Sequence, residues 1–111
     1  MSVTRTVTVL GGGSFGTAIA NIAATNGHRV FLWMRDSARA DQVQASRENE
    51  RYMPGYDLHD NLTATTDIEQ SVSQSDIIFV SIPSKSFRSV VENARQYIKP
   101  NQIVLRVMRS T

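Results

Sequence analysis

The sequence contains no cysteine. This absence excludes disulfide bonds, thiolate metal ligands and a cysteine nucleophile, and it favours a reducing, cytoplasmic setting. The only two histidines, His28 and His59, lie far apart in the sequence, without the spacing that is typical of metal ligands. We therefore expect no metal site.

Long apolar runs and clusters of like charge are missing as well. No stretch approaches the roughly 20 apolar residues that a bilayer-spanning helix needs, and residues 1–6 carry no apolar signal core. Twelve Lys and Arg against ten Asp and Glu give a net charge of +2, and the basic residues are scattered. We therefore expect neither a membrane span nor a nucleic-acid partner.

The chain has 111 residues, which is enough for one domain with one buried core. A dehydrogenase with separate cofactor and substrate domains is usually longer. We therefore interpret residues 1–111 as a single domain.

Apolar segments alternate with amphipathic ones along the chain. Segments rich in β-branched and apolar residues predict strands at residues 6–10, 29–34, 62–65, 77–82 and 103–108. Apolar residues at helical spacing predict helices at 14–26, 37–47, 66–74 and 84–98. This alternation predicts an α/β fold of the Rossmann type, with about five parallel strands in the order 3-2-1-4-5 and helices on both faces.

Candidate capping residues precede three of these helices. Asp36 or Ser37 is expected to cap the second helix, and Ser84 the fourth. Thr66 and Glu69 fit a capping box, in which each side chain bonds the backbone N–H of the other residue. Residues 48–61 are polar and contain Pro54-Gly55, so we expect them to form a long surface loop.

Glycines follow the first predicted strand in the segment Gly11-Gly12-Gly13-Ser14-Phe15-Gly16, a G-x-G-x-x-G sequence. The motif alone is weak, but here a strand precedes it, a helix follows it and a second strand comes at βαβ spacing. Gly11 is expected to allow a tight turn, Gly13 to let a pyrophosphate approach the backbone, and Gly16 to let helix and strand pack closely. The amides of Ser14 and Phe15 would then face the phosphates of a dinucleotide.

The end of the second strand normally selects the cofactor. An acidic residue there bonds the ribose hydroxyls of NAD, whereas an arginine accommodates the 2′-phosphate of NADP. Arg35-Asp36 offers both. Arg35 can bind that phosphate or stack on the adenine, and Asp36 can instead cap the next helix. The pattern slightly favours NADP, or use of both cofactors, over NAD alone.

Pro83 and Ser84 follow the fourth predicted strand. Ligands of doubly wound sheets lie beyond the carboxyl ends of the strands, where the strand order switches between the first and the fourth. We therefore expect Pro83 and Ser84 to border the nicotinamide ribose, and Lys85 to be solvated. Four aromatic residues are expected in the core rather than against the cofactor: Phe31, Trp33, Phe79 and Phe87.

Five segments together go beyond a general fingerprint: residues 9–18, 32–36, 47–49, 51–55 and 80–84. In these segments the chain resembles the N-terminal domain of the bacterial-type NAD(P)-dependent glycerol-3-phosphate dehydrogenases, and the likeness runs from about Thr6 to Leu105. The Arg-Tyr-Met-Pro-Gly sequence at 51–55 and the Trp-Met-Arg sequence at 33–35 are much more specific than the glycines.

The resemblance implies a reaction and a set of contacts. The reaction is reversible hydride transfer between NAD(P)H and dihydroxyacetone phosphate, which gives sn-glycerol 3-phosphate for phospholipid synthesis. By this family pattern, Ser14, Phe15 and Arg35 would contact the cofactor. Tyr52 would close over it from the loop, although the same tyrosine can equally serve to anchor the loop.

The chain departs from the family pattern in two ways. The family continues into a helical domain that supplies the substrate-phosphate ligands and a catalytic lysine, and this sequence contains none of it. After the fifth strand the family has a Thr-Lys-Gly turn, where this chain has Arg109 in place of the lysine. Arginine keeps the charge but is a poor proton donor. We therefore assign no catalytic residue and expect the chain alone to reduce no dihydroxyacetone phosphate.

The fifth strand is expected to form an open edge of the sheet with the apolar residues Ile103, Val104, Leu105 and Val107. Exposed apolar edges pair readily with another chain, so we expect self-association. Two other functions stay open at this point: the cofactor domain of another small-substrate dehydrogenase, and a non-catalytic NAD(P)-binding regulatory module. The 51–55 loop favours the glycerol-3-phosphate dehydrogenase, whereas the missing substrate domain favours the regulatory module.

Overall fold

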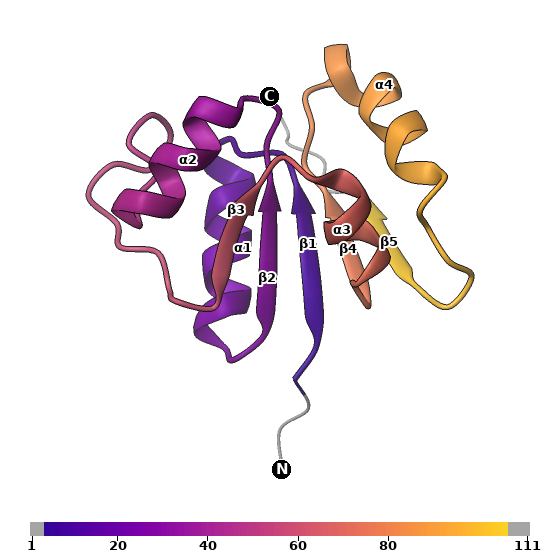
Figure 1. Cartoon of the computed structure of the whole chain (residues 1–111), viewed down its shortest axis with the longest axis horizontal. Coiled ribbons are helices and arrows are strands. Elements are labelled where there is room, and N and C mark those ends of the chain that lie inside the picture. Colours follow the sequence, from indigo (N-terminus) through magenta and orange to yellow (C-terminus); the bar gives the residue numbers. More distant parts are fainter. Residues whose placement is uncertain (1–3, 107–111) are drawn as a thin grey trace.

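The computed structural model describes residues 4–106, which form a five-stranded parallel sheet with helices on both faces (Figure 1). The strand order is β3-β2-β1-β4-β5, which confirms the predicted Rossmann-type topology. The elements in chain order are β1 (Thr6–Leu10), α1 (Ser14–Thr25), β2 (Arg29–Trp33), α2 (Ser37–Ser46), β3 (Leu62–Thr65), α3 (Ile68–Ser73), β4 (Ile77–Val80), α4 (Ser84–Arg95) and β5 (Ile103–Arg106).

The central strands β1 and β2 are buried on both faces. Residues 7–10 of β1 and 30–33 of β2 are all buried, which explains why their apolar residues run on without alternation. β1 lies between β2 and β4, with Val9 opposite Leu32 on one side and Phe79 on the other. This register brings the carboxyl ends of the three strands together at the same end of the sheet.

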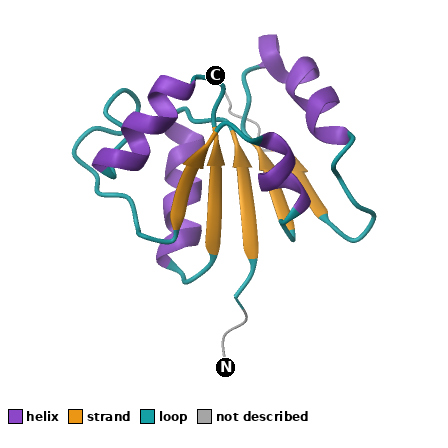
Figure 2. Ribbon diagram, viewed as in Figure 1, coloured by secondary structure: helices purple, strands orange, loops and turns teal. Residues whose placement is uncertain are grey.

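Helices cover both faces of the sheet (Figure 2). An apolar cluster on each face holds them there. On one face α1 contributes Ala20 and Ala24, and α2 contributes Ala40 and Val43. The opposite face is covered by α3 and α4, chiefly through Val72 and Val90. The small side chains of Ala20 and Ala24 permit a close approach of α1 to the strands.

The helix caps differ from the prediction in two of three places. Asp36 caps α2, because its Oδ1 accepts a hydrogen bond from the amide of Ala38 at 3.0 Å. The predicted capping box of Thr66 and Glu69 is wrong, since Asp67 is the N-cap of α3 and accepts from the amide of Gln70 at 2.9 Å. The predicted cap at Ser84 is wrong as well.

Ser84 is the first helical residue of α4, and Pro83 stands at its N-cap without a side-chain hydrogen bond. Proline fits there because its backbone is already extended, at φ −56° and ψ 147°. The predicted strands are slightly too long, since β2 ends at Trp33 and β4 at Val80. Both shorten at the cavity end of the sheet.

The segment between α2 and β3 is only partly the polar surface loop that its composition predicts. It turns back on itself, because the amide of Leu58 bonds the carbonyl of Arg47 at 2.8 Å. We call residues 47–58 the tyrosine loop, after Tyr52. Two of its side chains, Asn49 and Leu58, are buried and contradict the prediction of a surface loop. Leu58 packs in the apolar cluster beneath α1 and α2.

β5 forms one edge of the sheet, as predicted, and its apolar side chains are uncovered. Ile103 is 54% exposed, Val104 44% and Leu105 45%. The predicted contribution of Val107 to this edge lies outside the described residues, as does Arg109. The described part of the chain therefore carries an open apolar edge, which is an aggregation hazard in isolated sheets.

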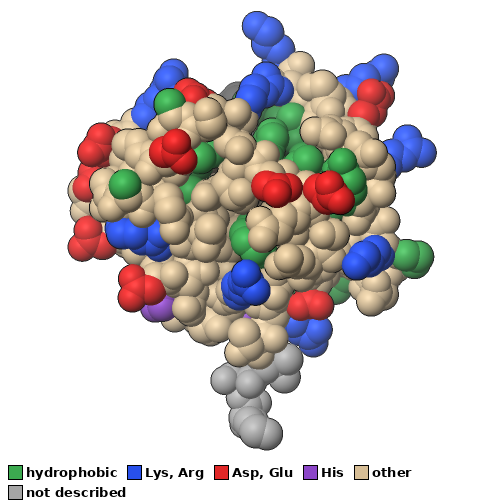
Figure 3. All heavy atoms as spheres, viewed as in Figure 1, with side chains coloured by type: hydrophobic (Ala, Val, Ile, Leu, Met, Phe, Trp, Pro, Cys, Tyr) green, Lys and Arg blue, Asp and Glu red, His purple; other side chains and the backbone are tan. Residues whose placement is uncertain are grey.

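Charged side chains of both signs are interspersed on the face of the molecule shown in Figure 3. That face, as far as it is described, carries no continuous basic surface. Within residues 4–106, no helix is both long and apolar enough to span a bilayer. The same residues contain no group of three or more histidine or acidic side chains that would suit a metal ion.

Candidate functional site

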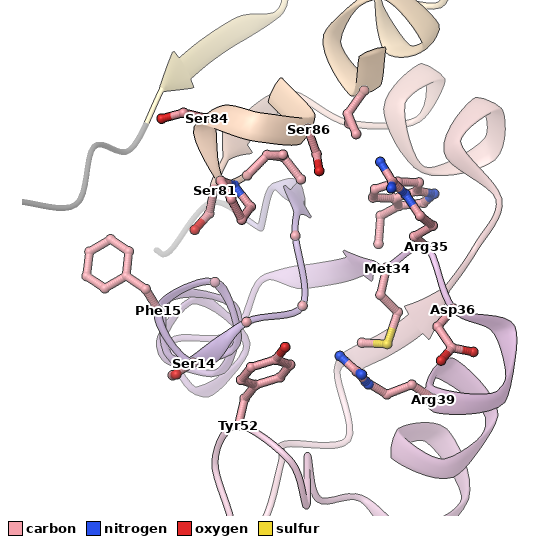
Figure 4. Close-up of a pocket in the computed structure, with 18 of the residues that line it drawn as sticks. Ser14, Phe15, Met34, Arg35, Asp36, Arg39, Tyr52, Ser81, Ser84 and Ser86 are labelled. Carbon is pink, nitrogen blue, oxygen red and sulfur yellow. The ribbon is translucent and has the colours of Figure 1, made fainter. Parts of the chain in front are cut away.

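A cavity of about 700 Å³ opens beyond the carboxyl ends of β1, β2 and β4 (Figure 4). Its wall combines the β1–α1 turn, the end of β2, the start of α2, the tyrosine loop and the β4–α4 turn. All nine residues that the sequence analysis assigned to a cofactor line this cavity: Gly11, Gly13, Ser14, Phe15, Gly16, Arg35, Tyr52, Pro83 and Ser84. The structure thus brings together the residues of four separate segments.

The floor of the cavity is the glycine turn, residues 11–16. Gly11 has φ +122°, and a Cβ at this position would lie 2.1 Å from the carbonyl oxygen of Ser81. Gly16 is equally constrained, because its Cβ would lie 2.1 Å from the carbonyl oxygen of Gly11. Glycine at these two positions therefore allows β1, α1 and the β4–α4 turn to approach each other closely.

Gly13 differs from Gly11 and Gly16, the other two glycines that define the motif. Its backbone is extended, and no protein atom lies within 4 Å of the place where a Cβ would stand. Packing of the chain therefore does not require glycine here. The space over Gly13 belongs to the cavity, so a side chain at this position would project into the room that a ligand needs.

The start of α1 is left open toward this space. Its N-cap is Gly13, which makes no side-chain hydrogen bond, and its first turn contains no acidic residue. The first amides of a helix have no partner within the helix, and the helix dipole favours an anion beside them. Ser14 and Phe15, both exposed, begin this turn and line the cavity. The arrangement suits a phosphate group.

The end of β2 supplies a cation and a carboxylate with different tasks. Arg35 is exposed and lines the cavity. Asp36 also lines it, but one of its carboxylate oxygens is engaged as the cap of α2. Trp33 was expected in the core; it is 7% exposed there and also lines the cavity, with its Nε1 donating to the carbonyl of Thr66 at 3.0 Å.

Tyr52 reaches the cavity from the tyrosine loop and is half-buried. Two arginines lie against its ring: the Cζ atom of Arg39 is 4.9 Å from the ring centroid, and that of Arg51 is 5.2 Å from it. Arg39 belongs to α2 and lines the cavity, whereas Arg51 does not. The sequence pattern did not indicate Arg39 as a site residue, although its position four residues after Arg35 was a usable signal.

Asn49 is a second site residue that the sequence pattern did not indicate. It is fully buried beneath the glycine turn, and its Nδ2 donates to the carbonyl of Gly12 and to Oγ1 of Thr17, both at 2.9 Å. Its Oδ1 accepts from the amide of Tyr52 at 3.4 Å. Asn49 therefore ties the tyrosine loop to the glycine turn. Nothing in the apolar pattern indicates such a contact, because the residue lies in a polar stretch.

The opposite end of the cavity is formed by the β4–α4 turn and the end of β5. Pro83 and Ser84 are exposed at this end, and Lys85 is exposed as predicted. Figure 4 shows Phe15 and Ser84 on one side of the cavity and Arg35, Asp36 and Arg39 on the other. Arg106 also lines the cavity, and its Cζ lies 3.9 Å from the centroid of the Phe87 ring.

The charge of the cavity wall is mainly positive. Among the described residues that line it, Arg35, Arg39 and Arg106 are cations, and Asp36 is the one carboxylate. Together with the open amides of α1, this wall is suited to an elongated, anionic ligand.

A comparison with known families agrees with this geometry. Residues 6–109 match the family described as the NAD-dependent glycerol-3-phosphate dehydrogenase N-terminus. The glycerol-3-phosphate dehydrogenase [NAD(P)+] of Saccharophagus degradans is 63% identical over 105 residues, covering 95% of this chain and 29% of that protein. The corresponding protein of Teredinibacter turnerae is 56% identical, covering 89% of this chain and 29% of that protein.

Solved structures show the same relationship. The crystal structure of the glycerol-3-phosphate dehydrogenase from Coxiella burnetii superposes with a TM-score of 0.88 at 31% sequence identity, covering 93% of this chain and 32% of that one. The chain therefore spans about three-tenths of the length of these relatives. Since the match covers nearly the whole sequence, the chain belongs to the NAD-dependent glycerol-3-phosphate dehydrogenase N-terminus family.

Proposed function

We propose that this chain is the cofactor-binding part of an oxidoreductase that reduces dihydroxyacetone phosphate to sn-glycerol 3-phosphate, and that it binds NAD or NADP in the cavity of Figure 4. The observation that carries the proposal is the open space over Gly13 beside the uncapped start of α1. Family membership supports the choice of cofactor and reaction. We further propose that residues 1–111 form a single dinucleotide-binding domain.

The described residues fit a dinucleotide. Gly11, Gly13 and Gly16 would form the floor under the pyrophosphate, and the amides of Ser14 and Phe15 would donate hydrogen bonds to it. At the β2 end, Arg35 and Tyr52 would hold the adenosine; this assignment agrees with their place on the cavity wall. At the other end, Pro83 and Ser84 would border the nicotinamide ribose. When bound, the nicotinamide ring supplies the hydride for carbonyl reduction.

The binding proposal is tested by titrating NADH and NADPH into the wild type and Gly13→Val by calorimetry. We expect wild-type binding and loss of both ligands in the variant, because the new side chain fills the space over the turn. Circular dichroism should show that the variant keeps its fold, since the site has no close neighbours. A wild type that binds neither cofactor, or a folded variant that binds as well as the wild type, would overturn the proposal.

Arg35→Ala separates two roles of Arg35 in the same titrations. Selective loss of NADPH affinity would mean that the guanidinium contacts the 2′-phosphate. Equal loss for both cofactors would mean that it stacks on the adenine, which NADH and NADPH share.

The chain spans about three-tenths of the length of its glycerol-3-phosphate dehydrogenase relatives. We therefore propose that this chain alone does not reduce dihydroxyacetone phosphate. The measurement is NADPH oxidation with that substrate, and turnover above the buffer control would contradict the proposal. The two alternative functions, a regulatory module or another small-substrate dehydrogenase, gain no support from the family match.

We also propose that the isolated chain self-associates through β5. The exposed side chains of Ile103, Val104 and Leu105 support this, since pairing with a second copy would cover them. Light scattering over a range of concentrations should show a mass above that of the monomer, and Leu105→Lys should lower it. A monodisperse monomer at high concentration would contradict the proposal. A cytoplasmic location is likewise a proposal, supported by the absence of cysteine.

A further inference from the structure

We propose that Arg39 acts with Arg35 as the binding site for the 2′-phosphate of NADP, so that the chain prefers NADPH over NADH. This inference rests on the proposed function, because it assumes that the adenosine lies at the β2 end of the cavity. It assigns the cofactor preference to a residue of α2 that lies outside the glycine motif and outside the end of β2.

Arg39 is placed by the cap of the helix that carries it. Asp36 ends the extended segment and begins α2 by accepting the amide of Ala38 at 3.0 Å. Arg39 then falls in the first turn of α2, half-buried, and lines the same cavity as Arg35. Figure 4 shows both arginines on the side of the cavity where Asp36 lies.

The carboxylate of Asp36 has a task other than ribose binding. A free carboxylate at the end of β2 accepts hydrogen bonds from the ribose hydroxyls of NAD and repels a 2′-phosphate. Here one oxygen of Asp36 accepts a hydrogen bond from the backbone of α2. Arg35 precedes Asp36 directly in the sequence, and Arg39 follows it by three residues. The local charge at this end of the cavity is therefore positive, which favours the cofactor with the additional phosphate.

The ring of Tyr52 holds the guanidinium of Arg39 at the cavity. The Cζ atom of Arg39 lies 4.9 Å from the centroid of that ring, within the range of a cation–π interaction. Packing against the ring limits the motion of a long side chain, so less conformational entropy is lost when a phosphate binds. The face of the guanidinium packs on the ring, whereas its N–H groups lie in its plane and can donate to two phosphate oxygens. Tyr52 is thus a positioning residue for Arg39.

Arg106, the third cation of the wall, does not belong to this site. It lies on β5 against the ring of Phe87, at 3.9 Å from its centroid, whereas Arg35 and Arg39 belong to the β2–α2 segment. β2 and β5 are separated in the sheet by β1 and β4. The two cations at the adenosine end are therefore Arg35 and Arg39.

The test uses two ligands that differ only in the 2′-phosphate: adenosine 5′-phosphate and adenosine 2′,5′-bisphosphate. Calorimetric titration of the wild type should show tighter binding of the bisphosphate. Arg39→Ala should weaken bisphosphate binding roughly 10- to 100-fold, the usual effect of losing a charged hydrogen bond, and leave binding of the monophosphate unchanged. Arg39→Lys should keep part of the preference, because it retains the charge but not the fork of donors.

Arg51→Ala is the matched control. Arg51 lies against the same ring, at 5.2 Å, but does not line the cavity, so its removal should leave both affinities unchanged. Equal losses for the two ligands in Arg39→Ala, or the same selective loss in Arg51→Ala, would overturn the inference. The proposed function fails in a different way: a wild type that binds neither NADH nor NADPH.

Discussion

The glycine turn and the tyrosine loop both border the cavity, but they are held in place by different means. The glycine turn is fixed by backbone approaches so close that two of its positions have no room for a Cβ. The tyrosine loop is fixed by side chains that point inward: the amide of Asn49 under the turn and Leu58 in the apolar core. The glycine turn depends on the absence of Cβ atoms, whereas the tyrosine loop depends on buried side chains.

This difference shows that the wall of one cavity can be built from segments that tolerate substitution to different degrees. Substitution of Gly11 or Gly16 introduces an overlap with backbone atoms that cannot move without moving a strand or a helix. Substitution in the tyrosine loop instead leaves a cavity or an unpaired polar group, which neighbouring atoms can partly relax around. Three substitutions test this comparison.

Gly11→Ala should have the largest effect. The new Cβ would stand 2.1 Å from the carbonyl oxygen of Ser81, on a backbone with φ +122°. Strain at such a position and the forced shift of the β4–α4 turn together should lower the free energy of unfolding by about 4 kcal/mol or more. Urea denaturation followed by circular dichroism measures this. Gly13→Ala is the control and should change the free energy by less than about 0.5 kcal/mol.

Asn49→Ala should have an intermediate effect. It removes the donor to the carbonyl of Gly12 and to Oγ1 of Thr17, and leaves the part-buried carbonyl of Gly12 with only the long bond from Oγ1 of Thr17 at 3.4 Å. We expect a loss of about 2 kcal/mol in the free energy of unfolding, together with faster proteolysis at 51–56. Asn61→Ala is the control, since Asn61 is exposed and its amide lies 3.4 Å from the carbonyl of Ala24. An equal loss of unfolding free energy in both variants would show that the hydrogen bonds of Asn49 do not hold the tyrosine loop in place.

Gly55→Ala should have the smallest effect of the three. Gly55 has a positive φ, +83°, as Gly11 does, but no atom lies within 4 Å of its Cβ position. Only the backbone preference is lost, which amounts to about 1 kcal/mol. The comparison of Gly11→Ala with Gly55→Ala, by the same denaturation measurement, isolates the steric contribution. Similar losses in the two variants would contradict the view that close packing fixes the glycine turn.

The sequence was informative wherever a rule depends on neighbours along the chain. The alternation of apolar segments predicted all five strands and their order, and the glycine spacing predicted the floor of the cavity. The errors lie where two local choices compete. Thr66 and Asp67 can each cap α3, and the structure has Asp67 as the N-cap, with its own amide bonded to Oγ1 of Thr65 at 3.0 Å.

Asn49 and Arg39 escaped prediction for a different reason. Each acts through contacts with segments far away in the sequence: Asn49 with Thr17, and Arg39 with the ring of Tyr52. A polar residue in a polar stretch carries no periodic signal, so its burial depends on how the loop folds back over α1. Family resemblance indicated the loop as a unit but not which side chain fixes it.

By itself, the sequence determined the strand order, the two covered faces of the sheet and the turn at Gly11–Gly16, because hydrophobic period and glycine spacing are local properties of the chain. The tertiary structure alone decided the roles of two further polar side chains at the cavity, Asn49 and Arg39. It buried Asn49 and set Arg39 against Tyr52. These outcomes depend on distances between separate segments, and such distances are fixed only when the core has packed.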